Sequence, residues 1–412
     1  MVDYQINKIG LLPGGTYSIA NGINNKGEVA GNADRPLTRD PQYPTQVAVF
    51  YSHSTGLIEI NTPNANFSEF GVGLDINDSS QVVGYIEEDF YGPFIWSAAT
   101  GIWSLYFGYC SAAAINNQGV IVGSQMQGVD PQAACVWDGP QQTFRLLELW
   151  TVPDTSEATG VNDQGIIVGW KQPVGGQPAA FIVYPGGGLQ PVAAFQEPGS
   201  KAYGIGNGGH VVGESINAGV TRAYMWTQAG GLVYLDTLGG ISSWATDVNT
   251  AGSAVGTVVM PDGNPRAFLY ENGVMNDLNT LIPPGSGWQL EDAVAINDNG
   301  QIAGNGQFNG ARMGFVLNPL SKFFVPKQII EVLKHIIRYR RLPIWPFGWP
   351  FPDPEPGPAR WKEVYPQGND PMILAAMTSL VSELDDEDMR KQLDHLLIPW
   401  LKKELERLEN EK

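Results

Sequence analysis

The sequence predicts an all-β fold, a closed β-propeller of seven four-stranded blades, followed by a C-terminal helical extension. A ten-residue pattern recurs seven times, and its spacing from Asn24 to Asn297 averages 45.5 residues, which is the length of a propeller blade. The two ends of the repeat region look like complementary parts of one blade. Fifty glycines and 30 prolines in 412 residues, without a collagen period, favour a fold with many tight turns.

The repeat is defined by an asparagine and by a glycine seven residues after it. The glycine is present in all seven copies, and the asparagine in six, with Gly206 in its place in the fifth. Such agreement at one offset indicates a true repeat. The aligned segments are 22–31, 75–84, 114–123, 160–169, 204–213, 247–256 and 295–304.

The first strand of each copy is expected to be innermost, because only alanine or glycine stands four positions before the asparagine, where blades would converge on an axis. An Asn-Asp/Asn-x-Gly turn, whose residues tolerate left-handed backbone, joins it to a short Val/Ile-rich second strand. The third strand carries aromatic and aliphatic residues, as in 94–96 and 268–270, which suit the space between blades. The fourth is Leu-rich, as in 57–60.

The ends of the repeat region predict a closed ring. The seventh copy stops after its third strand at Leu317, while residues 4–11 resemble a fourth strand placed before the first inner one. If that strand completes the last blade, both free edges disappear. An open β-solenoid, the main competitor, would have shorter repeats and no need of complementary ends.

The pattern Ala-x-x-Ile-Asn-Asp-x-Gly-x-Ile-Val-Gly, followed by Ala-Phe-Leu-Tyr and a Leu-rich strand, resembles the HAF repeat family of bacterial proteins over residues 3–319. The resemblance implies a propeller-like fold and no particular chemistry. Such proteins are often secreted or surface-attached, yet the sequence from Met1 lacks the basic and apolar regions of a signal peptide. We therefore expect a cytoplasmic location.

The charge lies mostly in the repeat region. The formal net charge is -18, and residues 1–319 hold 10 lysines and arginines against 27 aspartates and glutamates. An acidic surface repels nucleic acid and anionic membranes, so neither is an expected partner. No stretch reaches the length of apolar residues that a membrane span needs.

Four segments are predicted: the propeller (1–320), a basic amphipathic helix (321–342), a Pro/Trp-rich linker (343–368) and a helical tail (369–412). The basic helix is expected to dock on its own acidic propeller, or else to project towards another protein. The leucine stripe of the tail would pack within the chain, self-associate or bind a protein partner. The candidate partner or assembly residues of the linker and the tail are Trp345, Phe347, Trp349, Phe351, Leu393, Leu397, Trp400, Leu401 and Leu405.

No catalytic, metal or cofactor constellation emerges from the sequence. The four histidines are scattered, and each Asn-rich turn offers at most one carboxylate, too few for calcium. Asp75 and Asp247 stand two residues before the asparagine, where they would line the channel as an acid and a base or simply be solvated. Cys110 and Cys135 would pair or stay free.

The leading functional interpretation is a protein-binding scaffold that uses the variable loops between second and third strands and between blades, because irregular loops on a rigid frame usually carry recognition. A carbohydrate-binding propeller with Trp170, Trp244 and Trp288 as stacking residues is an alternative, and a propeller lyase or hydrolase is a third. The candidate loop residues are Arg35, Arg39, Tyr43, Glu87, Glu88, Phe90, Tyr91, Trp170, Arg222, Trp244, Arg266, Trp288, Phe308 and Arg312.

Overall fold

The computed structural model describes residues 4–36, 44–60, 70–87, 91–105, 109–126, 132–138, 143–147, 154–192 and 199–320. The chain divides into two units, 1–321 and 322–412, and all described residues belong to the first. The predicted basic helix, the linker and the tail, with every candidate residue from Trp345 to Leu405, lie outside the described residues. The described part of the chain contains no helix long and apolar enough to cross a membrane.

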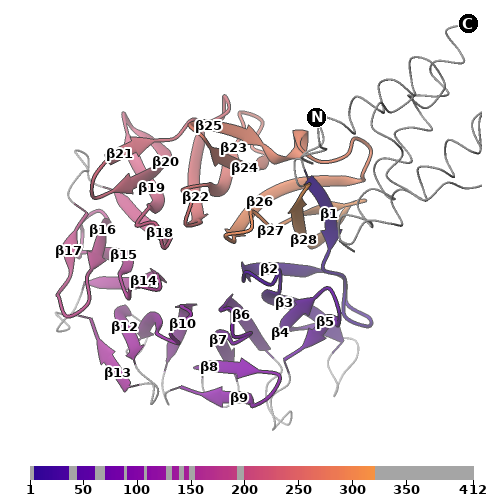
Figure 1. Cartoon of the computed structure of the whole chain (residues 1–412), viewed down its shortest axis with the longest axis horizontal. Helices are drawn as coiled ribbons and strands as arrows, with labels where there is room; N and C mark the ends of the chain where they lie inside the picture. Colours follow the sequence, from indigo (N-terminus) through magenta and orange to yellow (C-terminus); the bar gives the residue numbers. More distant parts are fainter. Residues whose placement is uncertain are drawn as a thin grey trace, which may run out of the picture. The chain divides into compact units, whose positions relative to one another are not determined.

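The first unit is the predicted propeller, a ring of seven antiparallel four-stranded sheets (Figure 1). The first blade contains β2 (Ser18–Ile23), β3 (Val29–Pro36), β4 (Pro44–Ser52) and β5 (Gly56–Glu59). The second contains β6 (Phe70–Ile76), β7 (Val82–Glu87), β8 (Tyr91–Ser97) and β9 (Gly101–Ser104). The third contains β10 (Cys110–Ile115), β11 (Ile121–Met126), β12 (Gln132–Asp138) and β13 (Thr143–Leu146).

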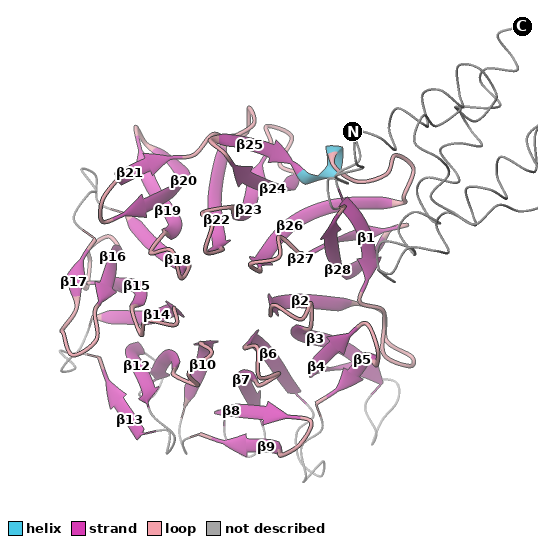
Figure 2. Cartoon of the chain, in the orientation of Figure 1, coloured by secondary structure: helices cyan, strands magenta, loops and turns pink. Residues whose placement is uncertain are grey.

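The remaining blades follow in the same order around the ring (Figure 2). The fourth contains β14 (Thr155–Val161), β15 (Ile167–Gln172), β16 (Ala179–Val183) and β17 (Gln190–Pro191). The fifth contains β18 (Ser200–Ile205), β19 (Val211–Asn217), β20 (Val220–Thr227) and β21 (Gly231–Tyr234). The sixth contains β22 (Ser242–Val248), β23 (Ala254–Val259), β24 (Pro265–Glu271) and β25 (Val274–Asp277), and a 3-10 turn, η1 (Leu278–Thr280), follows.

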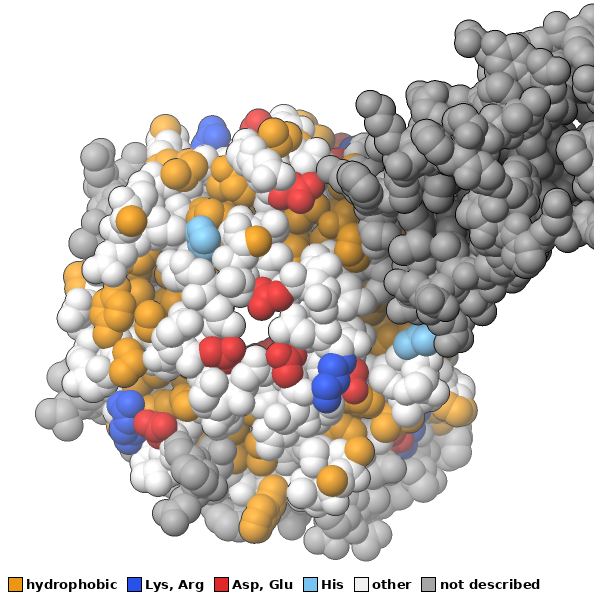
Figure 3. Space-filling model, in the orientation of Figure 1, with side chains coloured by type: hydrophobic (Ala, Val, Ile, Leu, Met, Phe, Trp, Pro, Cys, Tyr) orange, Lys and Arg blue, Asp and Glu red, His pale blue; other side chains and the backbone are white. Residues whose placement is uncertain are grey.

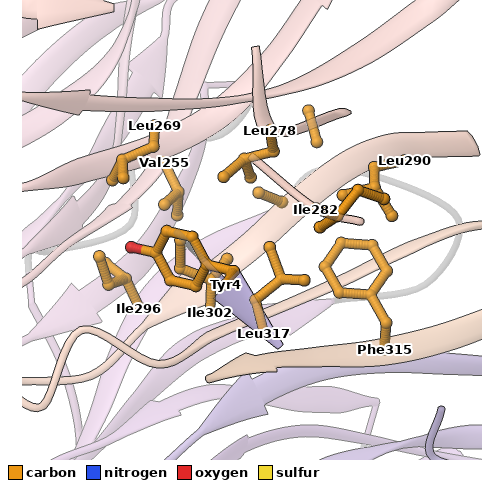
Figure 4. Packing of buried hydrophobic residues seen from close by; sticks show 12 residues of the cluster. Tyr4, Val255, Leu269, Leu278, Ile282, Leu290, Ile296, Ile302, Phe315 and Leu317 are labelled. Carbon is orange, nitrogen blue, oxygen red and sulfur yellow. The ribbon is translucent and has the colours of Figure 1, made fainter. Parts of the chain in front are cut away.

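The seventh blade confirms the predicted closure. Its own strands are β26 (Trp288–Ile296), β27 (Ile302–Phe308) and β28 (Ala311–Pro319), and β1 (Tyr4–Lys8) pairs with β28 as the fourth. Tyr4 lies among Ile296, Ile302 and Leu317 in a core that also takes in Val255 of the sixth blade (Figure 4). Burial of this apolar surface seals the ring where β1 meets β28.

The repeat glycine is explained by a β-bulge in each inner strand. In every blade the pairing between the first and second strands shifts by one residue, as between Ala20 and Gly22. This shift brings the backbone of the first strand close to the repeat glycine on the second. A Cβ on Gly31 would collide with the carbonyl oxygen of Ile19, and the other six repeat glycines meet the same obstacle. The invariant glycine is therefore a steric requirement of the blade.

Antiparallel order gives the disc two distinct faces. The Asn-rich turns and the hairpins between third and fourth strands lie on one face, which we call the turn face. The loops between second and third strands, together with the connections between blades, lie on the other, which we call the loop face. The sequence expectation that these two loop types share a face is thus confirmed by the topology.

Candidate functional site

The repeat asparagines hold the turn-face end of the central channel together. Asn77 Oδ1 accepts hydrogen bonds from the backbone N–H groups of Ser79 (3.0 Å) and Gln81 (3.1 Å), and its Nδ2 donates to the Asn116 carbonyl of the next blade (3.1 Å). The same link to the next blade recurs around the ring. The donor and acceptor residues are Asn24 and Asn77, Asn77 and Asn116, Asn116 and Asn162, Asn162 and Gly206, Asn249 and Asn297, and Asn297 and Asn24.

Gly206 is the exception because no side chain fits at its position. A Cβ there would lie 2.7 Å from the carbonyl oxygen of Asn249 and 2.8 Å from that of Val248. Backbone atoms at that distance cannot move aside as a flexible side chain would. The fifth blade therefore gives up the amide link to the sixth.

A second ring is formed by the residues that follow these positions. The backbone N–H of Asn25 donates to Asp78 Oδ1 (2.8 Å), and that of Asp78 donates to Asn117 Oδ1 (2.8 Å). Neutral residues separate the carboxylates, which limits repulsion between like charges. In ring order the residues are Asn25, Asp78, Asn117, Asp163, Asn207, Thr250 and Asp298.

Asp75 and Asp247 each bridge two blades next to these rings. Asp75 Oδ1 accepts from the N–H of Ile76 (2.8 Å) and Oδ2 from that of Ile115 in the third blade (2.9 Å). Asp247 makes the equivalent pair of bonds to the sixth and seventh blades. Removal from bulk water raises the pKa of Asp75 to about 7 and that of Asp247 to about 6, although the backbone hydrogen bonds oppose the shift.

The turn end encloses a cavity of about 150 Å³, lined by both rings and by Asp75. Acidic side chains surround the opening at the centre of this face (Figure 3). Both oxygens of Asp75 and of Asp247 already accept backbone hydrogen bonds, so these carboxylates act as ties between blades. Within the described residues, no group of three or more His, Cys, Asp or Glu side chains could hold a metal ion.

The loop-face end of the inner strands is different from blade to blade. The position compared is the residue five before the asparagine slot, which pairs with the residue after the repeat glycine. The first three blades carry uncharged residues there, and the next four carry three charged residues and a tryptophan. In blade order the residues are Ile19, Val72, Ser111, Glu157, Lys201, Trp244 and Asp292.

Glu157 and Lys201 belong to a cluster where the fourth and fifth blades meet. Trp170 donates a hydrogen bond to the Glu157 carboxylate, and Lys201 Nζ lies 4.5 Å from the centre of the Trp170 ring. Tyr203 hydrogen-bonds to Glu214 on the neighbouring strand. Burial raises the pKa of Glu157, against the effects of Trp170 and Lys201. The fold therefore maintains a carboxylate here at an energetic cost.

Asp292 extends this sector to the seventh blade. Its carboxylate accepts from Asn305 Nδ2 (2.8 Å) and lies 3.9 Å from the Arg312 guanidinium. Burial is the main reason that its pKa is raised. We call Glu157, Lys201, Trp244 and Asp292 the polar sector. Sequence reasoning singled out only Trp244 among them, although aligning the seven copies column by column would have exposed the asymmetry.

The structure places the described members of the predicted loop residues on strands, because the pairing of first, second and third strands continues beyond the hydrophobic pattern. Arg35 on β3 binds Glu59 with two guanidinium nitrogens, each at 2.8 Å, and Arg266 on β24 binds Asp277 at 2.8 Å. Glu87, Tyr91, Trp170, Arg222, Trp244, Trp288, Phe308 and Arg312 also belong to strands. Arg39, Tyr43, Glu88 and Phe90 lie outside the described residues.

The three tryptophans proposed to stack on sugars have different surroundings. Trp170 has Lys201 over its ring, and Trp288 packs against Phe308 (5.1 Å) and Phe315 (5.6 Å). Trp244 is partly exposed and makes no ring contact with any residue in the described ranges. Packing thus accounts for two of these three side chains.

Cys110 and Cys135 lie within the third blade on β10 and β12. Both are buried free thiols, so the disulfide alternative is not the state of this structure. Burial raises the pKa of Cys110 to about 12. The two residues serve as small apolar side chains in the blade core.

Comparison with known families finds no match, and no curated protein matches the sequence. The β-propeller domain of the Trilobed protease from Pyrococcus furiosus is 10% identical, with a TM-score of 0.49 over 75% of this chain and 99% of its own. TolB from Acinetobacter baumannii is 12% identical (TM-score 0.41, 67% and 76%). Acylaminoacyl peptidase from Pyrococcus horikoshii is 10% identical (0.46, 71%), and only 49% of its length is covered. At these values the likenesses carry no inference about activity.

Proposed function

We propose that this protein, a HAF-repeat propeller, is a non-catalytic binding scaffold that recognises a protein partner at the polar sector on its loop face, with residues 369–412 as a second contact for assembly. The observation that carries the proposal is the asymmetry of the inner strands: Glu157, Lys201, Trp244 and Asp292 on one side, Ile19, Val72 and Ser111 on the other. Aromatic and cationic side chains at one site are typical of recognition surfaces.

The seven blades can be compared with one another at the sector position. A residue that the frame requires should be present in every blade, as the repeat glycine is. The inner strand pairs of blades one to three keep the same register with apolar or small residues at the sector position, so that register does not require charge there. Keeping carboxylates partly buried in blades four and seven costs stability, and a binding role explains that cost.

The arrangement of Asp75 and Asp247 favours a scaffold over a lyase or hydrolase. A general acid or base must have a carboxyl oxygen oriented towards a substrate proton. Each oxygen of these two carboxylates accepts a backbone hydrogen bond that ties neighbouring blades. Their positions are used by the frame, and the polar sector lies at the other end of the inner strands.

The test is affinity capture with the full-length chain as bait. We expect Lys201→Ala combined with Trp244→Ala to reduce recovery of a specific partner about tenfold or more, because interface hot spots lose over 1.4 kcal/mol on truncation. The matched control is Val72→Ala with Ser111→Ala, which alters the same register position in blades two and three. Equal recovery by both double variants would contradict the sector assignment.

A second measurement separates the other function classes. Isothermal titration of the wild-type chain with a panel of oligosaccharides should give no Trp244-dependent heat if the partner is a protein. Screening for hydrolysis or lyase activity should give none that Asp75→Asn or Asp247→Asn abolishes. A positive result in either experiment would replace the scaffold proposal by the corresponding alternative.

A further inference from the structure

A groove lies at the outer part of the boundary between the fifth and sixth blades, away from the polar sector. Its volume is about 520 Å³, within the usual range for ligand sites. The wall combines one guanidinium and two tyrosines with aliphatic side chains. The lining residues are Arg222, Val233, Tyr234, Leu235, Asp236, Tyr270, Gly273, Val274 and Met275.

Arg222 in this groove has no counter-ion among the described residues. Its Nε is buried without a hydrogen-bond partner, and no residue in the described ranges forms an ion pair with its guanidinium. A buried donor without a partner costs free energy that an incoming acceptor would recover. Asp236 also lines the groove, but its Oδ1 accepts the backbone N–H of Thr237 (2.6 Å).

The sixth blade shows what Arg222 lacks. Arg266 occupies the equivalent position, two residues before the residue that pairs with the repeat glycine, and it binds Asp277 at 2.8 Å. The fifth blade has Tyr234 at the position of Asp277. The arginine at this position is therefore paired with a carboxylate in the sixth blade, whereas none of the described residues forms an ion pair with it in the fifth.

Two exposed apolar side chains line the same groove as Arg222. Val233 is 50% exposed and Val274 is 57% exposed, which makes them two of the few large hydrophobic residues exposed in the described ranges. They belong to adjacent blades and line the same groove. An occupant that presents a carboxylate next to an aliphatic group would satisfy the arginine and cover both valines.

We propose that this groove binds a peptide segment of a partner protein in which an aspartate or glutamate is adjacent to an aliphatic residue. The carboxylate pairs with Arg222, and the aliphatic side chain packs on Val233 and Val274. Because the propeller as a whole is acidic, such a ligand depends on this local contact and not on long-range attraction.

The probe is a fluorescein-labelled, end-capped peptide Gly-Ser-Val-Glu-Leu-Ser-Gly, compared with the same peptide carrying Gln for Glu, titrated against the full-length chain by anisotropy. The wild type should prefer the Glu peptide about tenfold or more, since a charge-assisted hydrogen bond contributes that much. Arg222→Gln should abolish the preference. Sodium hexanoate, a small carboxylate, should compete far less well than unlabelled Glu peptide.

Tyr234→Asp is the second variant. It copies Asp277 and places an internal carboxylate near Arg222, so it should also abolish the preference. The unfolding temperature should fall, because Tyr234 packs against the apolar core between the fourth and fifth blades. Arg266→Gln is the matched control and should retain the full preference. The double variant Lys201→Ala with Trp244→Ala should bind this peptide as the wild type does, which keeps this test independent of the proposed function.

The proposal is overturned if the wild type does not distinguish Glu from Gln peptide, or if Arg222→Gln and Tyr234→Asp keep the distinction. Competition by hexanoate as strong as by the peptide would overturn the peptide assignment in favour of a small carboxylate ligand.

Discussion

The two ends of the inner strands treat the sevenfold repeat in opposite ways. At the turn end, six blades use the same asparagine for the same three or four hydrogen bonds, and the exception at Gly206 has a steric cause. At the loop end, one register position holds isoleucine, valine, serine, glutamate, lysine, tryptophan and aspartate in successive blades. The residue that recurs at the turn end is therefore required by the ring, and the position that varies at the loop end is available for recognition.

This difference also separates two meanings of a polar side chain in one protein. Amides and carboxylates at the turn end form hydrogen bonds within their own turns and to neighbouring blades, which stabilises the frame. Charged side chains in the polar sector are held against the effects of burial. The same residue types are therefore structural at one end and candidates for binding at the other.

Removing one ring asparagine should give the largest effect. Asn77→Ala leaves two backbone N–H groups and the Asn116 carbonyl without a partner, so we expect a loss of about 3–5 kcal/mol in the free energy of unfolding. Asn276→Ala, whose amide makes one long contact of 3.5 Å, should cost under about 1 kcal/mol. Urea denaturation measures both losses. Similar values for the two variants would contradict the structural role assigned to the repeat asparagines.

The stability of the protein should depend on pH through the two buried carboxyls of the turn end, Asp75 and Asp247. The folded pKa values of Asp75 (about 7) and Asp247 (about 6) exceed the ordinary 3.8, so the folded state holds these protons more tightly than the unfolded state. Stability is then greatest with both protonated and falls by several kcal/mol as pH rises from about 4 to about 7, because each unit of difference between the folded and unfolded pKa is worth about 1.4 kcal/mol.

Asp75→Asn should flatten this slope in denaturation curves recorded at several pH values. Asp262→Asn is the control, because hydrogen bonds from Asn264 hold the pKa of exposed Asp262 below its usual value, outside that window. A slope that is the same in the wild type and in Asp75→Asn would mean that this carboxyl stays ionised in the channel.

The smallest change is expected at the loop end. Glu157→Gln keeps an acceptor for Trp170 and removes a charge that burial disfavours, so the free energy of unfolding should change by no more than about 1 kcal/mol. Partner capture should fall in the same variant. A loss of stability as large as that of Asn77→Ala would instead make Glu157 part of the frame.

The fold could be predicted from the sequence because its causes are local and repeated. The glycine that a bulge demands and the small residue near the axis each occur seven times, and β1 completes the blade whose fourth strand is missing. The asparagine links between blades could not be predicted, since they depend on how close the turns come when the ring closes. The local turn accounts only for the bonds of Oδ1.

The candidate site was only partly accessible to sequence reasoning. Lys201, Tyr203 and Glu214 lie on paired strands of the fifth blade, and only packing of the fourth blade on the fifth brings Glu157 to them. Arg222 was recognised as a candidate, but its missing counter-ion becomes apparent only from the strand register that equates Tyr234 with Asp277.

Because β1 pairs with β28, the ring can close only after nearly the whole propeller has been translated. The two strands are separated by roughly 300 residues, which a ribosome takes about 15–60 s to synthesise at 5–20 residues per second. Until then the edge of β1 has no hydrogen-bonding partner and Tyr4 has no core to enter. The nascent chain must carry an adhesive strand through most of its synthesis, so its yield in a cell should depend on what shields that strand while the ring is still open.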